Sequence, residues 1–167
     1  MRIEEEIKLD YSDVLFRPKR STLKSRKEVN LSRTYKFKHS NREWTGIPII
    51  ASNMDGVGEL QVANSLSNFN IITALTKQHD LDLINSFTPI KHIFNYIALS
   101  CGTSQDSYKR LNSIISQHTY IQFICIDVAN GYSENFSHFV SSVREKYPSK
   151  TIIAGNFVTA DMTQELI

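Results

Sequence analysis

Five short apolar segments recur along the chain, and each is followed by a stretch whose apolar residues have helical spacing. Strict alternation of strands and helices predicts a parallel sheet joined by right-handed crossover connections, so the fold class is α/β. Every predicted strand ends in small or polar residues, which suits a site built from the loops after the strands. The predicted strands cover residues 47–51, 71–75, 93–99, 121–126 and 151–154.

The fourth segment, IQFICI at residues 121–126, gives the first indication of function. It is too short for a helix and rich in β-branched and aromatic residues, which predicts a strand buried on both faces. Asp127 stands at its carboxyl end, and Ser133 can cap the helix that follows. Because α/β folds bind ligands at the carboxyl ends of their strands, Asp127 is in place to contact one.

Residues 1–46 differ from the rest, because they are polar and hold too few apolar residues for a core of their own. Residues 35–39 alternate apolar and charged side chains, as a half-exposed strand does, and residues 41–44 can return it as a hairpin. We therefore expect two parts, an N-terminal arm or cap with a hairpin at 1–46 and five β/α units at 47–167. A basic run in the arm also allows a nucleic-acid arm or a solvated surface. It contains Arg17, Lys19, Arg20, Lys24, Arg26 and Lys27.

The composition is typical of a globular protein with one core of ordinary size. The 167 residues are 41% hydrophobic and 22% charged, and no apolar run approaches the roughly 20 residues of a membrane span. The N-terminus lacks the apolar core of a signal peptide, so we expect a cytoplasmic protein with no membrane partner. A net charge of +2 is too weak to favour a nucleic-acid partner.

The cysteines and histidines do not indicate a metal site. In a protein without a secretory signal, Cys101 and Cys125 are expected to be reduced thiols rather than a disulfide. No pair of cysteines or histidines has the spacing of metal ligands, so no metal is expected. The histidines concerned are His39, His92, His118 and His138.

Four blocks of the sequence stand in an order and at a spacing that identify a family. They are RPKRSTLKSR (17–26), GIPIIASNMDGVG (46–58), CIDVANGYSE (125–134) and IIAGNFVTADM (152–162). Together they resemble GMP reductase. The resemblance extends over about residues 3–167 and implies the eight-stranded (β/α) TIM barrel of that family, of which this chain holds about five strands. It also implies a homotetramer that reduces GMP to IMP with NADPH and releases ammonia.

The resemblance also implies that the catalytic cysteine of the family, in a loop after the sixth barrel strand, lies beyond Ile167. Cys101, expected to follow the third strand, and Cys125, expected inside the fourth, do not match it. A barrel of this type needs roughly 250 residues, so we expect the N-terminal portion of the enzyme, inactive alone. Its unpaired edge strands, 47–51 and 151–154, favour self-association.

Two alternatives stay open at this point. The chain can be a non-catalytic interaction remnant that pairs with another barrel half or with an intact subunit. It can also be an IMP dehydrogenase without its usual regulatory insertion, since no insertion fits between Leu75 and Ile93. The block NMD at residues 53–55 and the block CIDVANGYSE disfavour the dehydrogenase.

The resemblance assigns roles in cofactor binding to residues after the second and fourth strands. It implies that Asp127 accepts hydrogen bonds from the ribose of NADPH, with Val128 and Ala129 as an apolar wall, although Asp127 can instead cap the next helix. Lys77 matches a lysine that reaches both the cofactor and the reacting centre, so it is the candidate catalytic residue. The family usually has His-Lys-His-Tyr there, whereas residues 76–79 are Thr-Lys-Gln-His.

The resemblance assigns further residues to the cofactor and the substrate. Ser25 and Arg26 match the pair that reaches NADPH of a neighbouring subunit, where a guanidinium suits the extra phosphate. The substrate pocket is expected to contain Asn53, Met54, Asp55 and Asn156. Gly56 replaces a usual threonine and loosens the loop backbone, so a plain turn at residues 53–56 is the alternative.

Overall fold

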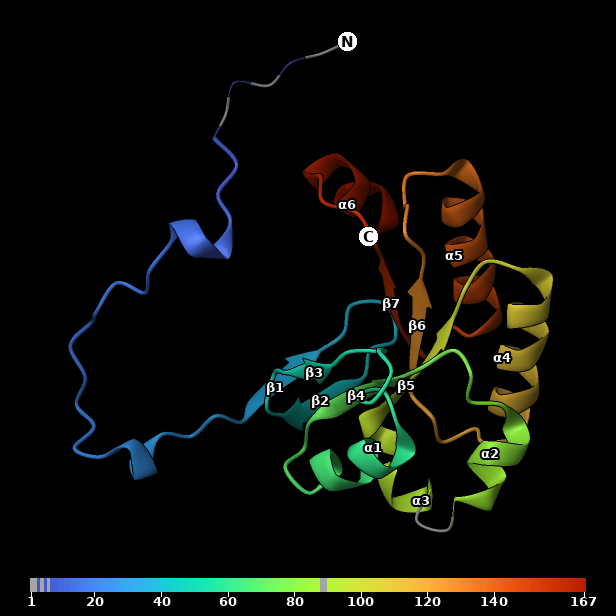
Figure 1. Ribbon diagram of the computed structural model, residues 1–167, viewed down its shortest axis with the longest axis horizontal. Helices are drawn as coiled ribbons and strands as arrows, with labels where there is room; N and C mark the ends of the chain where they lie inside the picture. The colour runs from blue at the N-terminus through green and yellow to red at the C-terminus, as the bar shows by residue number, and fades with distance from the viewer. Residues whose placement is uncertain (1–2, 4, 6, 88–89) are drawn as a thin grey trace. The chain divides into compact units, whose positions relative to one another are not determined.

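The computed structural model describes residues 3, 5, 7–87 and 90–167 (Figure 1). Contacts divide the chain into two compact units, Met1–Asn30 and Leu31–Ile167. The predicted hairpin therefore groups with the sheet in the second unit.

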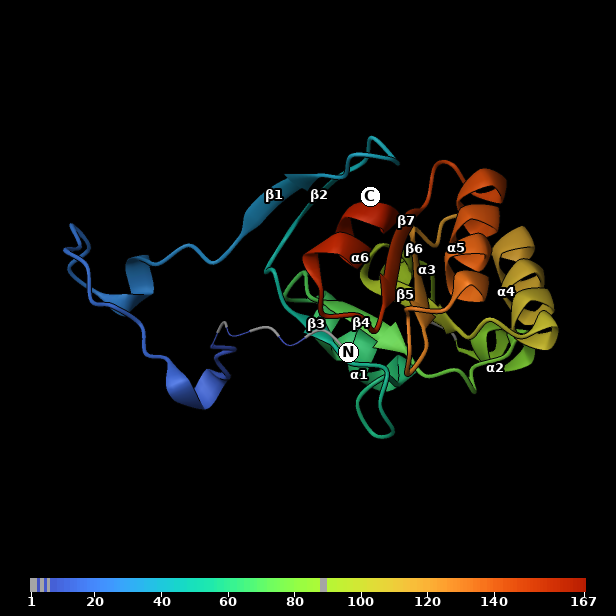
Figure 2. The ribbon, with the colours of Figure 1, turned by 90° about the horizontal axis from the view of Figure 1, so that it is seen from above.

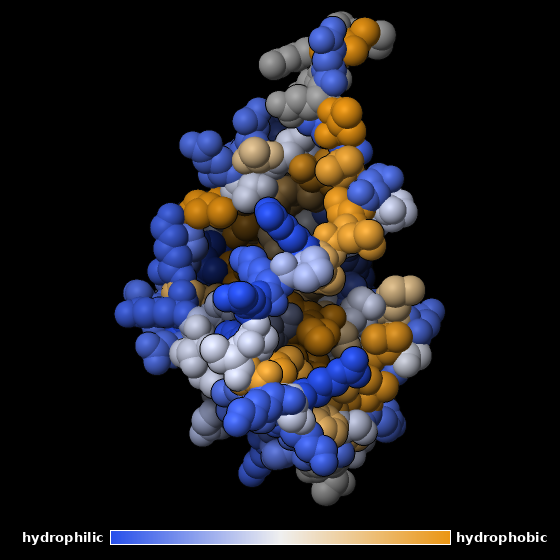
Figure 3. All heavy atoms as spheres, turned by 90° about the vertical axis from the view of Figure 1, so that its left-hand side faces the viewer, coloured by the Kyte–Doolittle hydropathy of each residue, from blue (hydrophilic) through white to orange (hydrophobic). Residues whose placement is uncertain are grey.

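The described part of the first unit contains two single-turn 3-10 helices, η1 (Tyr11–Asp13) and η2 (Arg26–Glu28). Every described residue in it is exposed, so it has no core of its own. Figure 3 shows hydrophobic residues exposed on the surface, next to hydrophilic ones. The exposed large apolar side chains of this unit include Ile7, Leu9, Tyr11, Val14, Leu15 and Phe16.

The second unit is built on a five-stranded sheet in which the strand order equals the chain order, β3-β4-β5-β6-β7. All four pairings are parallel. The order never reverses, which is the arrangement of a β/α barrel rather than of a doubly wound sheet. The strands are β3 (Ile50–Ala51), β4 (Ile72–Leu75), β5 (Ile97–Cys101), β6 (Phe123–Asp127) and β7 (Thr151–Gly155).

Helices connect these strands and cover one face of the sheet, so the predicted α/β alternation is confirmed. Figures 1 and 2 show α4 and α5 on this side and the N-terminal hairpin on the other. The helices are α1 (Leu60–Ser67), α2 (Leu81–Ser86), α3 (Ile90–Ile93), α4 (Gln105–Gln117), α5 (Glu134–Lys146) and α6 (Ala160–Leu166). The predicted cap is also confirmed, because the Ser133 hydroxyl accepts the Phe136 N–H at the start of α5.

The two faces of the sheet bury different sets of side chains. The main core lies between the sheet and the helices, and includes Leu75, Leu99, Ile124 and Ile126. The other face buries a small cluster of Ile72, Ala74, Ala98 and Phe123.

A hairpin of β1 (Arg33–Lys36) and β2 (Glu43–Gly46) packs on the smaller cluster. It contributes Phe37, whose ring meets Phe123 edge to face at 5.7 Å, and Trp44. The predicted hairpin is confirmed, with its first strand starting two residues earlier than expected.

The third predicted strand was placed four residues too early. Residues 93–99 were expected to form it, but Ile93 ends α3 and Phe94–Tyr96 form a 3-10 turn before β5 starts at Ile97. Ile93, Phe94 and Ile97 are all buried, so helical turn and strand form one apolar run that periodicity alone cannot divide. As a result Cys101 is the last residue of β5 instead of following it.

The buried face of β6 gives a stability prediction. Ile124 is 0% exposed, so Ile124→Ala leaves a cavity and is expected to lower the free energy of unfolding by about 2–5 kcal/mol. Ile49 is 59% exposed, and Ile49→Ala is the matched control with an expected loss of about 0.5 kcal/mol or less. Urea unfolding followed by circular dichroism measures both, and equal losses would contradict the assigned core.

Candidate functional site

Asp127, at the carboxyl end of β6, is the centre of a polar junction that joins three strands. Its Oδ2 accepts a hydrogen bond from Asn53 Nδ2 at 3.0 Å and lies 2.9 Å from Lys77 Nζ. Lys77 Nζ also donates to the Asp127 carbonyl at 2.7 Å. Asn53 follows β3 and Lys77 follows β4, so three residues predicted to belong to the site meet at one edge of the sheet.

The junction fits a curved sheet. Asn53 lies in the loop after β3 and Asp127 ends β6, and these two strands are three positions apart in the sheet, a separation of about 14 Å if the sheet were flat. The 3.0 Å bond between the two side chains is much shorter than that separation. The contact therefore agrees with strands that follow the curvature of a barrel wall.

Backbone hydrogen bonds beyond the ends of β6 and β7 fix the loops around Asp127. Val128 N donates to Gly155 O, Asn156 N donates to Val128 O, and Gly131 N donates to Asn156 O, each at 2.8 Å. A Cβ on Gly131 would lie 2.7 Å from Asn156 O, so this approach needs a glycine. Asn156 is thereby held beside the residues that follow Asp127.

Val128 and Ala129 point to different environments. The Val128 side chain packs against the main core on the helix side of the sheet, whereas Ala129 is exposed. An apolar wall beside a cofactor therefore falls to Ala129 alone, and that role stays a prediction.

Among the described residues of the loop after β3, Asn53 is the one that contributes a side-chain hydrogen bond to the junction. Met54 O accepts from Val57 N at 3.0 Å and from Gly58 N at 2.8 Å, so the residues after Asn53 form a turn. Met54 and Asp55 are both exposed. Gly56 has φ 75°, a left-handed conformation in which a threonine would be strained. The turn predicted as the alternative is present, and it places Asn53 at the junction.

Ser25 and Arg26 lie in the N-terminal unit, where both are exposed. Ser25 caps the η2 turn, and its hydroxyl accepts from Lys27 N at 3.3 Å. Their predicted contact with NADPH stays a prediction.

A buried network behind Lys77 was not expected from the sequence. His79 is 2% exposed, and its ring lies between Thr76 and Glu59. Arg110 of α4 donates to the carbonyl oxygens of His79 and Ser100. The only signal in the sequence is that the histidine stands at 79, one position after the usual place.

Both thiols of the chain are unsuited to nucleophilic attack. Burial raises the pKa of Cys101 to about 12, and the nearby Arg110 guanidinium opposes this only in part. Burial also raises the pKa of Cys125, and the nearby Ser100 side chain opposes this only in part. Neither cysteine is disulfide-bonded, and both stay protonated at neutral pH.

Two further searches covered the described part of the chain. None of its helices has the length and apolar character needed to cross a bilayer. Within the same residues, no three histidine, cysteine or acidic side chains gather into a group able to bind a metal ion.

Comparison with known protein families identifies the family of this chain. A family model described as the IMP dehydrogenase / GMP reductase domain matches residues 8–167. The chain belongs to the IMP dehydrogenase / GMP reductase family.

Curated relatives in this family are GMP reductases. The chain is 49% identical to the GMP reductase of Citrobacter koseri and 50% identical to that of Klebsiella pneumoniae subsp. pneumoniae, in both cases over 100% of this chain and 49% of the relative. The predicted resemblance to GMP reductase is confirmed. The chain spans about half the length of the curated relatives it matches, and corresponds to their N-terminal part.

A solved structure shows the same fold. The inosine 5'-monophosphate dehydrogenase from Legionella pneumophila matches with a TM-score of 0.73 over 93% of this chain and 46% of that chain, at 24% identity. This likeness confirms the predicted barrel fold, present here as five of its strands.

The raised pKa of Cys101 in this GMP reductase relative gives a pH-dependent prediction. The folded protein holds the thiol proton up to about pH 12, whereas the unfolded chain loses it near pH 9. Stability from this group is therefore fully present below pH 9 and is lost as the pH rises toward 12, by up to about 1.4 kcal/mol per pH unit. Urea unfolding at about pH 8 and about pH 10 is expected to show a larger loss in the wild-type protein than in Cys101→Ala. Equal losses of unfolding free energy in the two proteins would contradict the burial of the Cys101 thiol.

Proposed function

We propose that this chain forms the cofactor-orienting part of a GMP reductase, which reduces GMP to IMP with NADPH and releases ammonia. The observation that supports this most is the junction of Asn53, Lys77 and Asp127, which gathers a carboxylate, an amide and an ammonium group at the carboxyl ends of parallel strands. Ligands of β/α barrels bind at that end. The relatives named GMP reductase supply the reaction.

The residues present fit a dinucleotide with a ribose near β6. Both side-chain contacts of Asp127 use Oδ2, so within the described residues Oδ1 is available to accept from a ribose hydroxyl. The Asp127 side chain is 32% exposed, which lets a ligand reach it. Ala129 borders the same place, and Ser25 and Arg26 would meet the extra phosphate of a neighbouring subunit's cofactor in a homotetramer.

The proposal assigns one role to the cofactor and one to each side chain of the site. NADPH supplies the hydride when bound. Asp127 orients its ribose, and Lys77, fixed by Asp127, directs an ammonium charge toward the reacting base. Asn53 and Asn156 supply amide groups to the purine pocket that Met54 and Asp55 border. We expect the protein to act in the cytoplasm.

NADPH binding tests the role of Asp127. Asp127→Ala removes the ribose acceptor and is expected to weaken NADPH binding about tenfold, the effect of losing one charge-assisted hydrogen bond. Asp106→Ala is the matched control, because its side chain is 96% exposed on α4. Fluorescence titration of NADPH measures all three proteins. An unchanged dissociation constant for NADPH in Asp127→Ala would contradict the ribose contact. If the wild-type chain does not bind NADPH, the proposed function is wrong.

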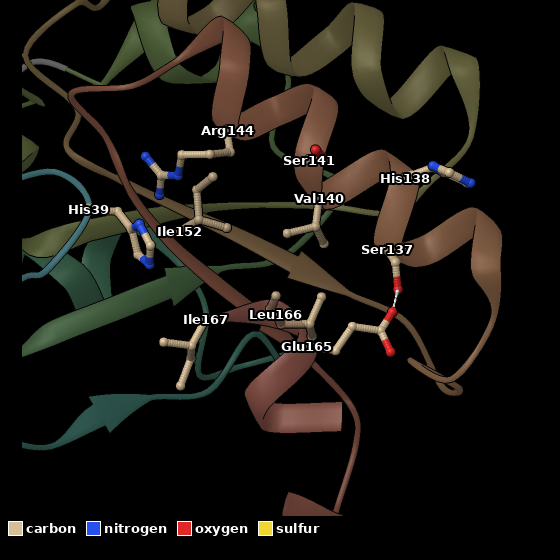
Figure 4. Close-up of a pocket in the computed structure, with 11 residues that line it drawn as sticks. His39, Ser137, His138, Val140, Ser141, Arg144, Ile152, Glu165, Leu166 and Ile167 are labelled. Atoms are coloured by element: carbon tan, nitrogen blue, oxygen red, sulfur yellow. Dashed lines mark hydrogen bonds between the residues drawn. The ribbon is translucent and has the colours of Figure 1, made fainter. Parts of the chain in front are cut away.

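A second candidate function is an interaction module that pairs with a chain supplying further β/α units. In the described residues, β3 and β7 each pair with one strand only, so each has an open edge. Beside β7 a cavity of about 520 Å³ lies between α5 and α6 (Figure 4). Its walls include Val140, Ile152 and Leu166, and Ser137 bonds Glu165 across it. An added unit would cover this apolar surface.

Complementation separates the two candidates. We expect no NADPH oxidation with GMP by this chain alone, because burial and partial burial raise the pKa values of Cys101 and Cys125, so both thiols stay protonated. Co-expression with the remaining half of the Klebsiella relative is expected to restore it if the chain is the cofactor-orienting part. Complex formation without activity favours the interaction module, and activity of the chain alone refutes both. The same assay with IMP and NAD tests the dehydrogenase alternative.

A further inference from the structure

We propose that His79 is a positioning residue that holds Lys77 against Asp127. His79 lies two residues after Lys77 in the loop between β4 and α2, yet its side chain turns inward and is 3% exposed. Lys77 in the same loop is 42% exposed and reaches the junction. The loop thus presents one charged group to the site and buries one ring behind it.

The imidazole of His79 is bonded at both nitrogens. Nδ1 lies 2.9 Å from Thr76 Oγ1 and 3.3 Å from the Thr76 carbonyl oxygen. Nε2 lies 3.3 Å from Glu59 Oε2. The imidazole thus contacts the Thr76 hydroxyl through Nδ1 and the Glu59 carboxylate through Nε2. The ring therefore ties the start of the loop to the start of α1.

Glu59 contacts His79 instead of capping its own helix. It occupies the N-cap position of α1, but its side chain makes no capping hydrogen bond. Next to it, Gly58 O accepts from Thr76 N at 2.9 Å, so backbone and side-chain contacts join the same two loops. The loop that bears Lys77 is thereby bound to the loop that follows Asn53.

Arg110 holds the other side of the loop. Its guanidinium, half buried on α4, bonds the His79 and Ser100 carbonyl oxygens, and Asp80 faces it from the start of α2. The charged groups packed around the imidazole and its backbone are thus Glu59, Arg110 and Asp80. With the loop fixed from α1 and from α4, Lys77 is held at the distance at which it meets Asp127.

Chemical labelling of lysine amines tests this without any nucleotide. An ammonium group held against a carboxylate and a carbonyl is shielded, so Lys77 should react slowly with an acetylating reagent compared with Lys109, which is 70% exposed. His79→Ala is expected to raise the Lys77 rate relative to Lys109 about fivefold, the factor that one lost hydrogen bond of about 1 kcal/mol gives. Mass spectrometry of the peptides reports each site separately.

Matched variants distinguish positioning from general loosening. His79→Gln can keep the bond to Glu59 and is expected to give an intermediate rate, and His138→Ala, an exposed imidazole on α5, is expected to give the wild-type rate. Lys150 is buried and bonds the Thr119 carbonyl away from this loop, so its rate should not change. If His79→Ala does not fold, Thr76→Val and Glu59→Gln each remove one bond and should raise the Lys77 rate.

The outcomes decide the proposal. A folded His79→Ala with an unchanged Lys77 rate overturns it, and so does a rise shared equally by Lys150. The relevance to NADPH rests on the proposed function, and titration of the same variants separates the two ideas. Faster labelling of Lys77 with no NADPH binding by the wild-type chain supports the positioning role and refutes the cofactor role. Faster labelling together with weaker NADPH binding supports both.

Discussion

The Asp127 carboxylate is the group on which the junction depends, because Asn53 and Lys77 both meet its Oδ2 from different loops. Because the strands bend, side chains from three loops converge instead of lying along a flat edge. One carboxylate then has partners from two other loops, and this is the place at which we propose that a ligand binds. The hairpin region covers the face of the sheet opposite the helices, where Phe37 and Trp44 pack against the smaller apolar cluster.

The loop after β4 shows how one sequence change can redistribute roles. A histidine on either side of the lysine, as the family usually has, would place imidazoles beside the exposed ammonium group. Here Thr76 and Gln78 take those positions and the imidazole of His79 is buried against Glu59. In the proposed arrangement the ring supports Lys77 from behind, and no imidazole stands directly beside the ammonium group at positions 76 and 78.

Much of the fold could be predicted from the sequence, because strands and helix caps depend on the local pattern of residues. The apolar run before Asp127 and the cap at Ser133 are short-range features; the cap is where the sequence predicts it, and the strand forms at Phe123–Asp127 instead of residues 121–126. The start of β5 could not be placed, since Ile93 and Ile97 belong to one apolar run that passes from helix to strand. The partners of His79 were also out of reach, because they depend on which loops the curved sheet brings together.

The winding of the sheet also bears on how the chain reaches its native state. Each strand after β3 pairs with the strand that precedes it in the chain, so each new β/α unit has a ready edge to dock on. Synthesis on the ribosome can therefore extend the sheet one unit at a time, with short loops closed at each step. Until the fourth strand of the sheet joins, Asn53 and Lys77 have no carboxylate to meet. The junction at the carboxyl ends of the strands is thus assembled late in an otherwise progressive process.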